Sequence, residues 1–440
     1  MHRSIKALPL ALLLGLSACG NDDPGEGPPK TVEGEWATET YGLVVKLRGN
    51  QVELFERTEV SCLPLAAGAL EEGRLPDVDL RFRREGDALV IEDSGTLYVR
   101  GKRAPIPDLC TRPPPSPKDP VLNFDILWNT FNEQYALFDL YGVDWRARYQ
   151  QFRPRVSATT SDDELFALLS EMLTPLRDGH INLGGGERHF SPKPFPDDFY
   201  ENHDAVLQYI DQHLMKGPGV TRTGGGQLAY QSLNARVGYI AVFKMMKFTE
   251  AADAASDVAA AGKAIDEALA ALGDKAALIV DVRFNTGGHD AVSLALASRF
   301  TTTERLGVSK KGRTRDGFTP ARELRFGPAG PRPFTKPVYV LQSGLSASAA
   351  EIFTMAMAPL PQVTLVGERS LGAHSDTPTR QLPNGWTFGL SIEQYFAPDG
   401  QMYESVGVPT DVAMPLDCAS IAAGTDRILQ EALRLTAALP

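Results

Sequence analysis

The sequence predicts an α/β protein whose main core follows a small β-rich domain and a helical segment. Three patterns along the 440 residues support this prediction. Short alternating apolar runs occupy residues 31–112, apolar residues recur every three or four positions over residues 118–183, and short apolar strands alternate with helices over residues 236–440. Apolar strands that alternate with helices are typical of a parallel sheet covered on both faces.

Residues 31–112 are expected to form a small sandwich or barrel. Runs such as residues 43–47 and 88–91 are typical of strands, and the Gly, Asn and Asp residues between such runs are typical of turns. Cys62 and Cys110 bracket the segment, so they can form a disulfide in an oxidising compartment. Cys418 is then left as a packed thiol. The proline-rich residues 113–117 mark a linker.

The helical segment, residues 118–183, carries two apolar stripes that we assign to core packing. The second stripe follows a capping box formed by Ser161 and Glu164. Residues 184–235 are less regular and hold one predicted helix near residues 203–215, so we interpret them as an insert or lid. The core, residues 236–440, has predicted strands at 237–242, 277–282, 338–341 and 363–366, with helices at 251–272, after 288 and at 347–358.

The N-terminus predicts an exported lipoprotein. A short basic start precedes an apolar run at residues 7–16, which is too short to span a bilayer as a helix. The run ends in LSAC at residues 16–19, which resembles a bacterial lipobox. We therefore expect residues 1–19 to be a signal peptide, Cys19 to carry the lipid and residues 20–30 to be a flexible tether. The expected location is the outer membrane, facing the periplasm or the cell surface.

The composition excludes two kinds of partner. The net charge of −11 argues against binding to nucleic acid and against electrostatic docking on an anionic membrane. The lipid is then the only expected link to a membrane. A hydrophobic share of 43% is typical of a folded chain with a large core.

Ser348 is the candidate nucleophile. It lies in SASAAE, residues 346–351, where a predicted buried strand turns into a helix. A serine at this point presents its hydroxyl at the end of the sheet, and the unpaired N–H groups of the new helix can stabilise an oxyanion. Serine also favours the helix N-cap. Both roles are satisfied if Ser346 caps the helix and Ser348 reacts.

A second strand end can supply another oxyanion donor. Residues 281–288, DVRFNTGG, end in Gly287 and Gly288, which let a backbone N–H approach a reacting atom closely. The pattern is neither GxGxxG nor a P-loop, so we expect no nucleotide cofactor. The chain has no HExxH and no cluster of Cys and His at ligand spacing, so we expect no metal.

A serine nucleophile needs a base, and histidine is the usual one near neutral pH. His180 closes the helical segment in the turn formed with Asp178 and Gly179, while His289 and His374 lie near the two strand ends. The residue types alone do not choose among these three histidines.

Six motifs, taken together and in this order, resemble the tail-specific, or C-terminal processing, serine peptidase family. They are LRDGH at 176–180, VGYI at 237–240, DVRFNTGG at 281–288, SASAAE at 346–351, VGERSLG at 366–372 and ESVGVPTD at 404–411. The similarity covers about residues 120–437 and is greatest to the tricorn-protease core and its bacterial relatives without a PDZ domain. It implies a crotonase-like or ClpP-like α/β core.

The resemblance also implies roles for residues at matching positions. Ser348 matches the nucleophile, because it stands three residues before Glu351 as the family serine stands before its glutamate. The N–H group of Ala349 matches one donor of the oxyanion hole. The N–H group of Gly287 or Gly288 matches the other.

The base distinguishes two branches of the family. The C-terminal processing proteases use a lysine directly after a Gly-Glu-x-x-x-Gly motif, and Ala373 occupies that position here. The tricorn branch uses a histidine at the end of the helical segment and a glutamate near the C-terminus, which match His180 and Glu404. Asp178 is expected to fix His180. His374, next to the missing lysine, is the second choice of base.

These expectations describe a lipid-anchored extracytoplasmic serine peptidase that cleaves peptides or unfolded proteins. The reaction would pass through a Ser348 acyl-enzyme with His180 as base and would need no cofactor. Two alternatives use the same fold, namely a catalytically inactive lipoprotein that binds ligands or peptides, and an esterase. Fold alone does not fix function. The presence of the serine, histidine, glutamate and both glycines at matching positions favours the peptidase.

Overall fold

The computed structural model describes residues 32–75, 78–112, 116–192, 199–251 and 253–438. The predicted signal peptide, Cys19 and the tether at residues 20–30 lie outside these ranges, as does part of the proline-rich linker. Within the described residues, no helix combines the length and the apolar character that crossing a membrane would require.

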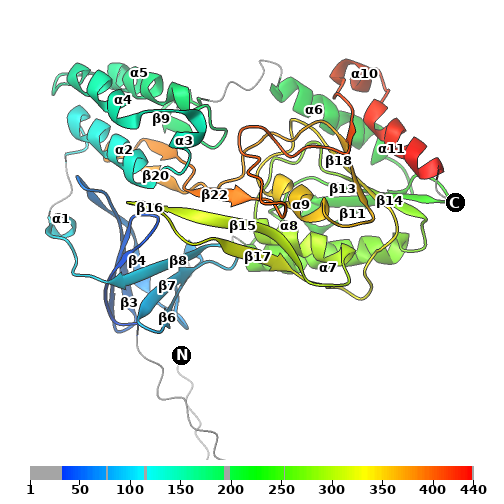
Figure 1. The fold of residues 1–440 in the computed structure, drawn as a ribbon, viewed down its shortest axis with the longest axis horizontal. Coiled ribbons are helices and arrows are strands. Elements are labelled where there is room, and N and C mark those ends of the chain that lie inside the picture. Colours follow the sequence, from blue (N-terminus) through cyan, green and yellow to red (C-terminus); the bar gives the residue numbers. More distant parts are fainter. Residues whose placement is uncertain (1–31, 76–77, 113–115, 193–198, 252, 439–440) are drawn as a thin grey trace, which may run out of the picture. The chain divides into compact units, whose positions relative to one another are not determined.

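The front of the described chain is one antiparallel sheet, where the sequence predicted a sandwich or barrel (Figure 1). Its strands lie in the order β4-β3-β2-β1-β8-β7-β6-β5. Alternating side chains such as Trp36, Val45 and Ile91 are buried in a core shared with the helices that follow. The strands are β1 Gly34–Thr38, β2 Leu43–Arg48, β3 Gln51–Arg57, β4 Cys62–Ala69, β5 Arg74–Leu75, β6 Leu80–Glu85, β7 Ala88–Glu92 and β8 Tyr98–Arg103.

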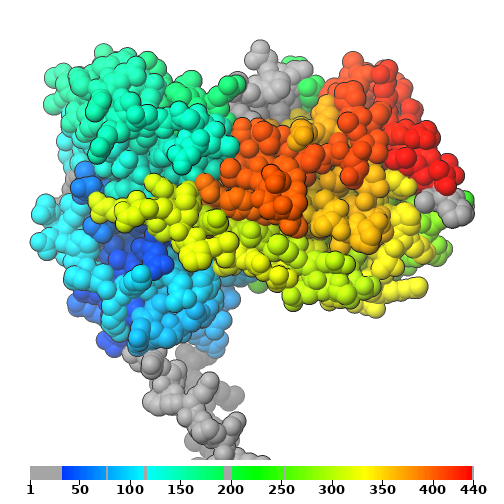
Figure 2. Space-filling view, in the orientation of Figure 1, coloured from blue at the N-terminus to red at the C-terminus, as the bar shows by residue number. Residues whose placement is uncertain are grey.

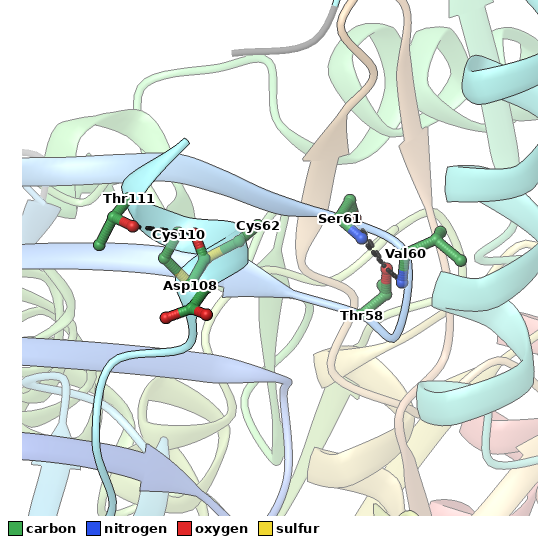
Figure 3. The surroundings of a disulfide bond; sticks show 7 residues. All are labelled: Thr58, Val60, Ser61, Cys62, Asp108, Cys110 and Thr111. Carbon is green, nitrogen blue, oxygen red and sulfur yellow. Dashed lines mark hydrogen bonds between the residues drawn. A yellow bond between two sulfur atoms is a disulfide. The ribbon is translucent and has the colours of Figure 1, made fainter. Parts of the chain in front are cut away.

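A disulfide joins Cys62, at the start of β4, to Cys110 in the short helix α1, Asp108–Thr111 (Figure 3). The two Cα atoms are 4.8 Å apart, within the range that a disulfide bridges. The bond links positions 48 residues apart, so it ties the end of the β-sheet segment back to its middle.

Removing this disulfide is expected to lower the free energy of unfolding by about 2–4 kcal/mol, because the unfolded chain regains the entropy of an open loop. The measurement is urea unfolding of the wild type and of the double variant Cys62→Ser/Cys110→Ser. Cys418→Ser is the matched control, since it removes a thiol and leaves the disulfide intact. Equal midpoints for the double variant and the wild type would contradict the prediction.

The helical segment contains four α-helices and leads into a small sheet. Ser161 begins α5 with both hydrogen bonds of the predicted capping box. The small sheet has the order β10-β9-β21-β20, so it pairs two strands, β9 and β21, that are just over two hundred residues apart in the sequence. The elements are α2 Pro120–Gln134, α3 Phe138–Tyr141, α4 Trp145–Phe152, α5 Asp162–Leu173, β9 Asn182–Gly185, β10 Arg188–Phe190, β20 Thr379–Gln381 and β21 Thr387–Gly389.

Residues 184–235 are not a separate insert, which corrects the sequence interpretation. Their first residues belong to β9 and β10, and their last residues form β11 and β12, which extend the central sheet beside β13. Leu228, Ala229 and Tyr230 are buried there, so this apolar run was the overlooked strand signal. The elements are α6 Phe199–Tyr209, a π-helical turn at Ile210–Leu214, β11 Thr221–Thr223, β12 Leu228–Ser232 and β13 Val237–Val242.

The central sheet has the order β11-β12-β13-β14-β18-β19-β23 and is parallel from β13 onward. Side chains of β13 alternate between its two faces: Ile240 and Val242 pack with α7, α8 and α9, whereas Tyr239 and Ala241 pack with α6 and α11. The elements are β14 Ala277–Asp281, β18 Val338–Gln342, β19 Val363–Gly367, β23 Val412–Ala413, α7 Ala254–Leu272, α8 Asp290–Ala297, α9 Ala349–Met357, α10 Cys418–Ala422 and α11 Arg427–Ala437.

The carboxyl ends of parallel strands share one edge of this sheet, where α/β proteins place their functional loops. The loops after β14, β18 and β19 therefore meet, and they carry the predicted motifs. A further sheet joins β15 Arg305–Thr314, β16 Gly317–Phe318, β17 Arg322–Phe326 and β22 Glu393–Phe396. In Figure 2 the orange segment, late in the chain, lies between the cyan-green helical segment and the gold part of the core.

Candidate active site

Ser348 lies at the bend between β18 and α9, directly before the first residue of the helix. Its backbone has φ 55° and ψ −126°, which is a strained conformation for a residue other than glycine. Two hydrogen bonds from its N–H hold this conformation, one to the carbonyl of Ala373 (2.9 Å) and one to Glu351 Oε2 (3.0 Å). The strain at a bend held in this way is typical of a functional position.

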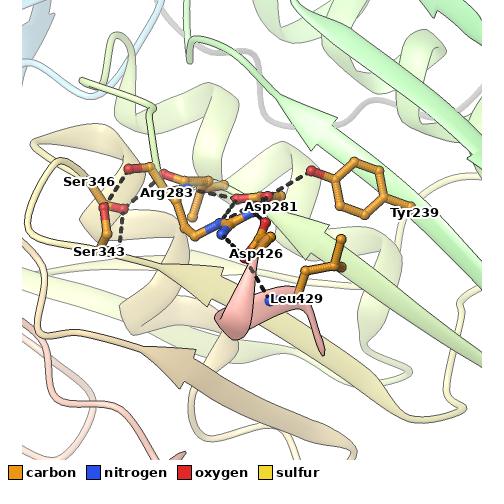
Figure 4. A network of polar contacts seen from close by, with 8 residues as sticks. Tyr239, Asp281, Arg283, Ser343, Ser346, Asp426 and Leu429 are labelled. Atoms are coloured by element: carbon orange, nitrogen blue, oxygen red, sulfur yellow. Dashed lines mark hydrogen bonds and ion pairs between the residues drawn. The ribbon is translucent and has the colours of Figure 1, made fainter. Parts of the chain in front are cut away.

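Ser346 does not cap α9, because Ser348 occupies that position. The Ser346 hydroxyl instead donates to the carbonyl of Val282 (2.8 Å) and accepts from the N–H of Ser343 (3.1 Å). It therefore fastens the loop after β18 to the end of β14 (Figure 4).

Gly287, the first residue of the glycine pair, lies against Ser348. A Cβ atom on Gly287 would stand 2.6 Å from the Ser348 Cβ and 3.0 Å from the Ala349 N, so only glycine fits there without a shift. The N–H of Gly287 donates to Asn285 Oδ1 (2.9 Å), which occupies it. Among the described residues, no acceptor bonds the N–H of Gly288 or of Ala349. These two groups are therefore the N–H donors left for a ligand.

Glu351 is the buried acceptor that organises this bend. Its carboxylate accepts from the N–H groups of Ser348 (3.0 Å), Gly372 (2.7 Å) and Ala373 (3.0 Å) and from the Ser370 hydroxyl. Burial alone would raise the pKa of Glu351, but the neighbouring His374 and these hydrogen bonds outweigh burial and hold the pKa below its usual value. The side chain is thus a carboxylate at neutral pH.

His374 is fully buried between two glutamates. Its Nε2 lies 3.2 Å from Glu351 Oε1, and its Nδ1 lies 3.3 Å from Glu404 Oε2. The backbone N–H of His374 also donates to Glu404 Oε2 (2.9 Å). Burial opposes a charge on the ring, but the carboxylates of Glu351 and Glu404 overcome it and raise the pKa of His374 to about 10.

The stability that His374 contributes is expected to fall with rising pH. Its folded-state pKa of about 10 exceeds the ordinary value of 6.5, so the folded chain holds this proton more tightly than the unfolded chain. The contribution is complete below about pH 6.5 and is lost as the pH rises through about 10. The measurement is the difference in urea midpoint between the wild type and His374→Gln from about pH 7 to about pH 10. A difference that stays constant across this range would contradict the prediction.

Two backbone segments bring Glu404 to His374. Gly372 accepts the N–H of Ser405 (2.8 Å), and the Ser370 hydroxyl accepts the N–H of Val408 (2.7 Å). Gly407 has φ 76°, and a Cβ there would stand 2.0 Å from the carbonyl oxygen of Ser370. The close approach of the two segments therefore depends on this glycine.

His180 and Asp178 come from the end of the helical segment. Asp178 is fully buried; its Oδ1 accepts the backbone N–H of His180 (2.8 Å), and its Oδ2 accepts the Tyr135 hydroxyl (2.9 Å). Asp178 thus fixes the backbone of His180 in the turn. Burial raises the pKa of the Asp178 carboxyl, and the nearby Glu404 raises it further.

Asp178, His180 and Glu404 form one cluster, in which one ligand atom from each lies within 4.8 Å of the others. Among the described residues, this is the group that could hold a metal ion, and the same spacing suits a histidine whose charged form is balanced by carboxylates. The buried atoms His180 Nδ1 and Glu404 Oε1 have no hydrogen-bond partner in the described chain. Buried polar atoms are usually paired, so these two are free to form hydrogen bonds with a ligand.

A continuous series of contacts therefore links the predicted site residues. It runs from Ser348 through Glu351 and His374 to Glu404, which shares its cluster with His180. His289 lies apart from this series, with its Nε2 3.7 Å from Asp257.

Sequence reasoning missed three supporting residues. Tyr135 looked like part of an apolar helical stripe, and only the fold reveals its bond to Asp178. Ser370 and Asn285 lay inside the quoted motifs without an assigned role. Their polar side chains among glycines at strand ends were the available signal.

Two family descriptions match the chain. Residues 236–414 match Peptidase family S41, and residues 117–174 match the Tricorn protease C1 domain. A carboxy-terminal-processing protease of Bartonella bacilliformis is 28% identical over 179 residues, which cover 40% of this chain and 39% of that protein. The carboxy-terminal processing protease CtpA of Bacillus subtilis is 26% identical over 158 residues, which cover 35% and 32%. The chain thus spans less than two fifths of the length of each of these relatives.

Solved structures share the fold over more of the chain. A putative peptidase from Parabacteroides merdae superposes with a TM-score of 0.62 and 28% identity, covering 74% of this chain and 98% of that one. Mature CPAF superposes with a TM-score of 0.55 over 73% of this chain and 96% of that one. Its identity of 12% makes that a likeness of fold alone.

Proposed function

Because this chain belongs to peptidase family S41, we propose that it is a serine peptidase that cleaves peptides or unfolded proteins with Ser348 as nucleophile. The observation that supports the proposal best is the geometry at the bend. Ser348 has a strained backbone, and Ala349, with a free N–H group, follows it directly. Gly287 lies against Ser348 in the fold, and the next residue, Gly288, carries the second free N–H group. Free N–H groups beside a nucleophile are what an oxyanion hole requires.

In the proposed mechanism, His180 takes the proton of the Ser348 hydroxyl as this oxygen attacks the peptide carbonyl. The N–H groups of Gly288 and Ala349 hold the oxyanion, while Gly287 contributes by having no side chain. His180 then gives its proton to the leaving amine, and water cleaves the acyl-enzyme by the reverse sequence of proton transfers. Glu404 and Asp178 balance the positive charge that His180 carries between the two proton transfers.

The contacts of the two candidate bases favour His180. Both ring nitrogens of His374 face carboxylates, and its pKa of about 10 keeps the ring protonated at neutral pH. A ring in that state has no lone pair with which to accept a proton. His180, in contrast, forms no ion pair with a carboxylate among the described residues, and its buried Nδ1 has no hydrogen-bond partner there.

For the location of the protein, we propose an exported lipoprotein of the cell envelope, attached through Cys19 at the outer membrane. The disulfide between Cys62 and Cys110 supports export, because disulfides persist in oxidising compartments. The LSAC sequence at residues 16–19 supports the lipid anchor.

The test is covalent labelling of the chain from Gly20 onward by a fluorophosphonate probe, with unfolded casein assayed in parallel. We expect the wild type to be labelled and to cleave casein, and Ser348→Ala to lose both. Ser157→Ala is the matched control, since Ser157 is an exposed serine outside the site. Labelling that persists in Ser348→Ala would refute the proposed nucleophile. Labelling without casein cleavage, together with hydrolysis of small esters, would indicate an esterase. The absence of both labelling and hydrolysis in the wild type would indicate a binding protein.

A further inference from the structure

We propose that His374 is a positioning residue, which sets the distance between the nucleophile and the base by joining Glu351 to Glu404 through both nitrogens of its ring. The inference rests on the proposed function, in which Ser348 and His180 react. His374 itself would touch neither the substrate nor the reacting atoms.

The first argument is the geometry of the ring. The two nitrogens of an imidazole point to opposite sides, and here each lies within 3.3 Å of a carboxylate oxygen. Only the doubly protonated ring has a donor for both carboxylates. The side chains of His374 and Glu351 are fully buried and that of Glu404 is 2% exposed, so water does not screen these contacts.

The second argument concerns the part of the site that lies beside each glutamate. Glu351 accepts the N–H of Ser348, so its position sets the position of the nucleophile. Glu404 lies in the cluster with Asp178 and His180, so its position and charge act on the proposed base. His374 is the link between the two halves, because it contacts both glutamates and its own N–H donates to Glu404.

The third argument is electrostatic. Without a cation between them, Glu351 and Glu404 would be two buried carboxylates facing one another, and such a pair repels. A shift of either glutamate would move one partner of the proton transfer. Displacements of about 1 Å in an active site can lower the rate about 10²-fold.

The test is a double-mutant cycle on steady-state hydrolysis, with His374→Gln, Glu404→Gln and the double variant. Active-site titration with the fluorophosphonate normalises each rate to the folded, labelled fraction. We expect His374→Gln to lower kcat about 10- to 100-fold with KM nearly unchanged, and the double variant to lose less than the product of the two single losses. We also expect the acid limb of the pH profile of kcat/KM, which reports protonation of the base, to move to higher pH in His374→Gln. Without the cation of His374, the negative charge of Glu404 stabilises the protonated form of His180 more strongly.

Several outcomes would overturn the inference. They are an unchanged kcat in His374→Gln, an effect confined to KM, or losses that multiply independently in the double variant. If His374→Gln does not fold, His374→Lys keeps a cation between the glutamates and is expected to fold and retain part of kcat. A folded lysine variant with no activity would refute the charge link. If Ser348→Ala abolishes activity but His374→Gln leaves it unchanged, only this inference is refuted. If activity survives Ser348→Ala, the proposed function itself is refuted.

Discussion

Ser348→Ala, His180→Ala and the double variant are all expected to lower kcat by about the same factor, roughly 10⁴ to 10⁶. The two side chains act as a unit in the proposed mechanism, so removing the second after the first costs little more. The remaining rate would come from substrate binding and from the N–H groups of Gly288 and Ala349, which neither substitution removes. The measurement is kcat and KM on one peptide or ester substrate under identical conditions.

His189→Ala is the matched control for the base, because His189 is an exposed histidine on β10. We expect it to retain wild-type kinetics. Thermal unfolding of each variant separates loss of chemistry from loss of the fold. A His180→Ala variant that keeps kcat within about tenfold of the wild type would contradict the assignment of the base. Losses that multiply in the double variant would show that the two residues do not act together.

The sequence predicted the elements of the site better than their connections. The strands that end at Asp281 and Gln342 were predictable because they are apolar up to their last residue and lead into loops that contain glycine or serine. The bend at Ser348 followed from the step between strand and helix. The contacts of His374 did not follow, because they join α9, the loop after β19 and the segment around Glu404, which meet only in the folded chain.

The same limit applies to residues 184–235. Short strands such as β11 and β10 have three residues each, which is too few for a periodic pattern to be recognised. Their assignment depends on partners, and the partner of β9 is β21, which lies two hundred residues later in the chain. Local sequence patterns therefore did not reveal that residues 184–235 form strands of two sheets whose other strands lie elsewhere in the chain.

The front β-sheet also has connections that its sequence does not reveal. The buried Arg380 donates to the carbonyl of Tyr41 (2.8 Å), pairs with Glu56 and donates to Gln134 (2.9 Å). Arg380 lies six residues after His374, so the front sheet and α2 brace the segment that carries the proposed positioning residue. The front sheet thus has a partly structural role, which no motif in residues 31–112 indicated.

Arg283 fastens the loop with the glycine pair to the C-terminal helix. Its guanidinium is fully buried, and its Nη1 and Nη2 each lie 2.8 Å from an oxygen of Asp426, which caps α11. Nε and Nη2 also contact Asp281, the last residue of β14, whose carboxylate accepts the Tyr239 hydroxyl at 2.6 Å (Figure 4). Gly287 lies only four positions after Arg283, so this network supports the proposed oxyanion hole.

Arg283→Met is therefore expected to lower the free energy of unfolding by about 3–5 kcal/mol, since it leaves two buried carboxylates without their cation. Urea unfolding measures the loss, and Arg434→Met, at an exposed pair with Glu431, is the control expected to keep the wild-type midpoint. Neutralising the stranded carboxylates with Asp281→Asn and Asp426→Asn in the same chain should recover part of the loss, because asparagine still caps a helix and still accepts the Tyr239 hydroxyl. If the triple variant is no more stable than Arg283→Met, the loss comes from the missing packing of the side chain, and the charge argument fails.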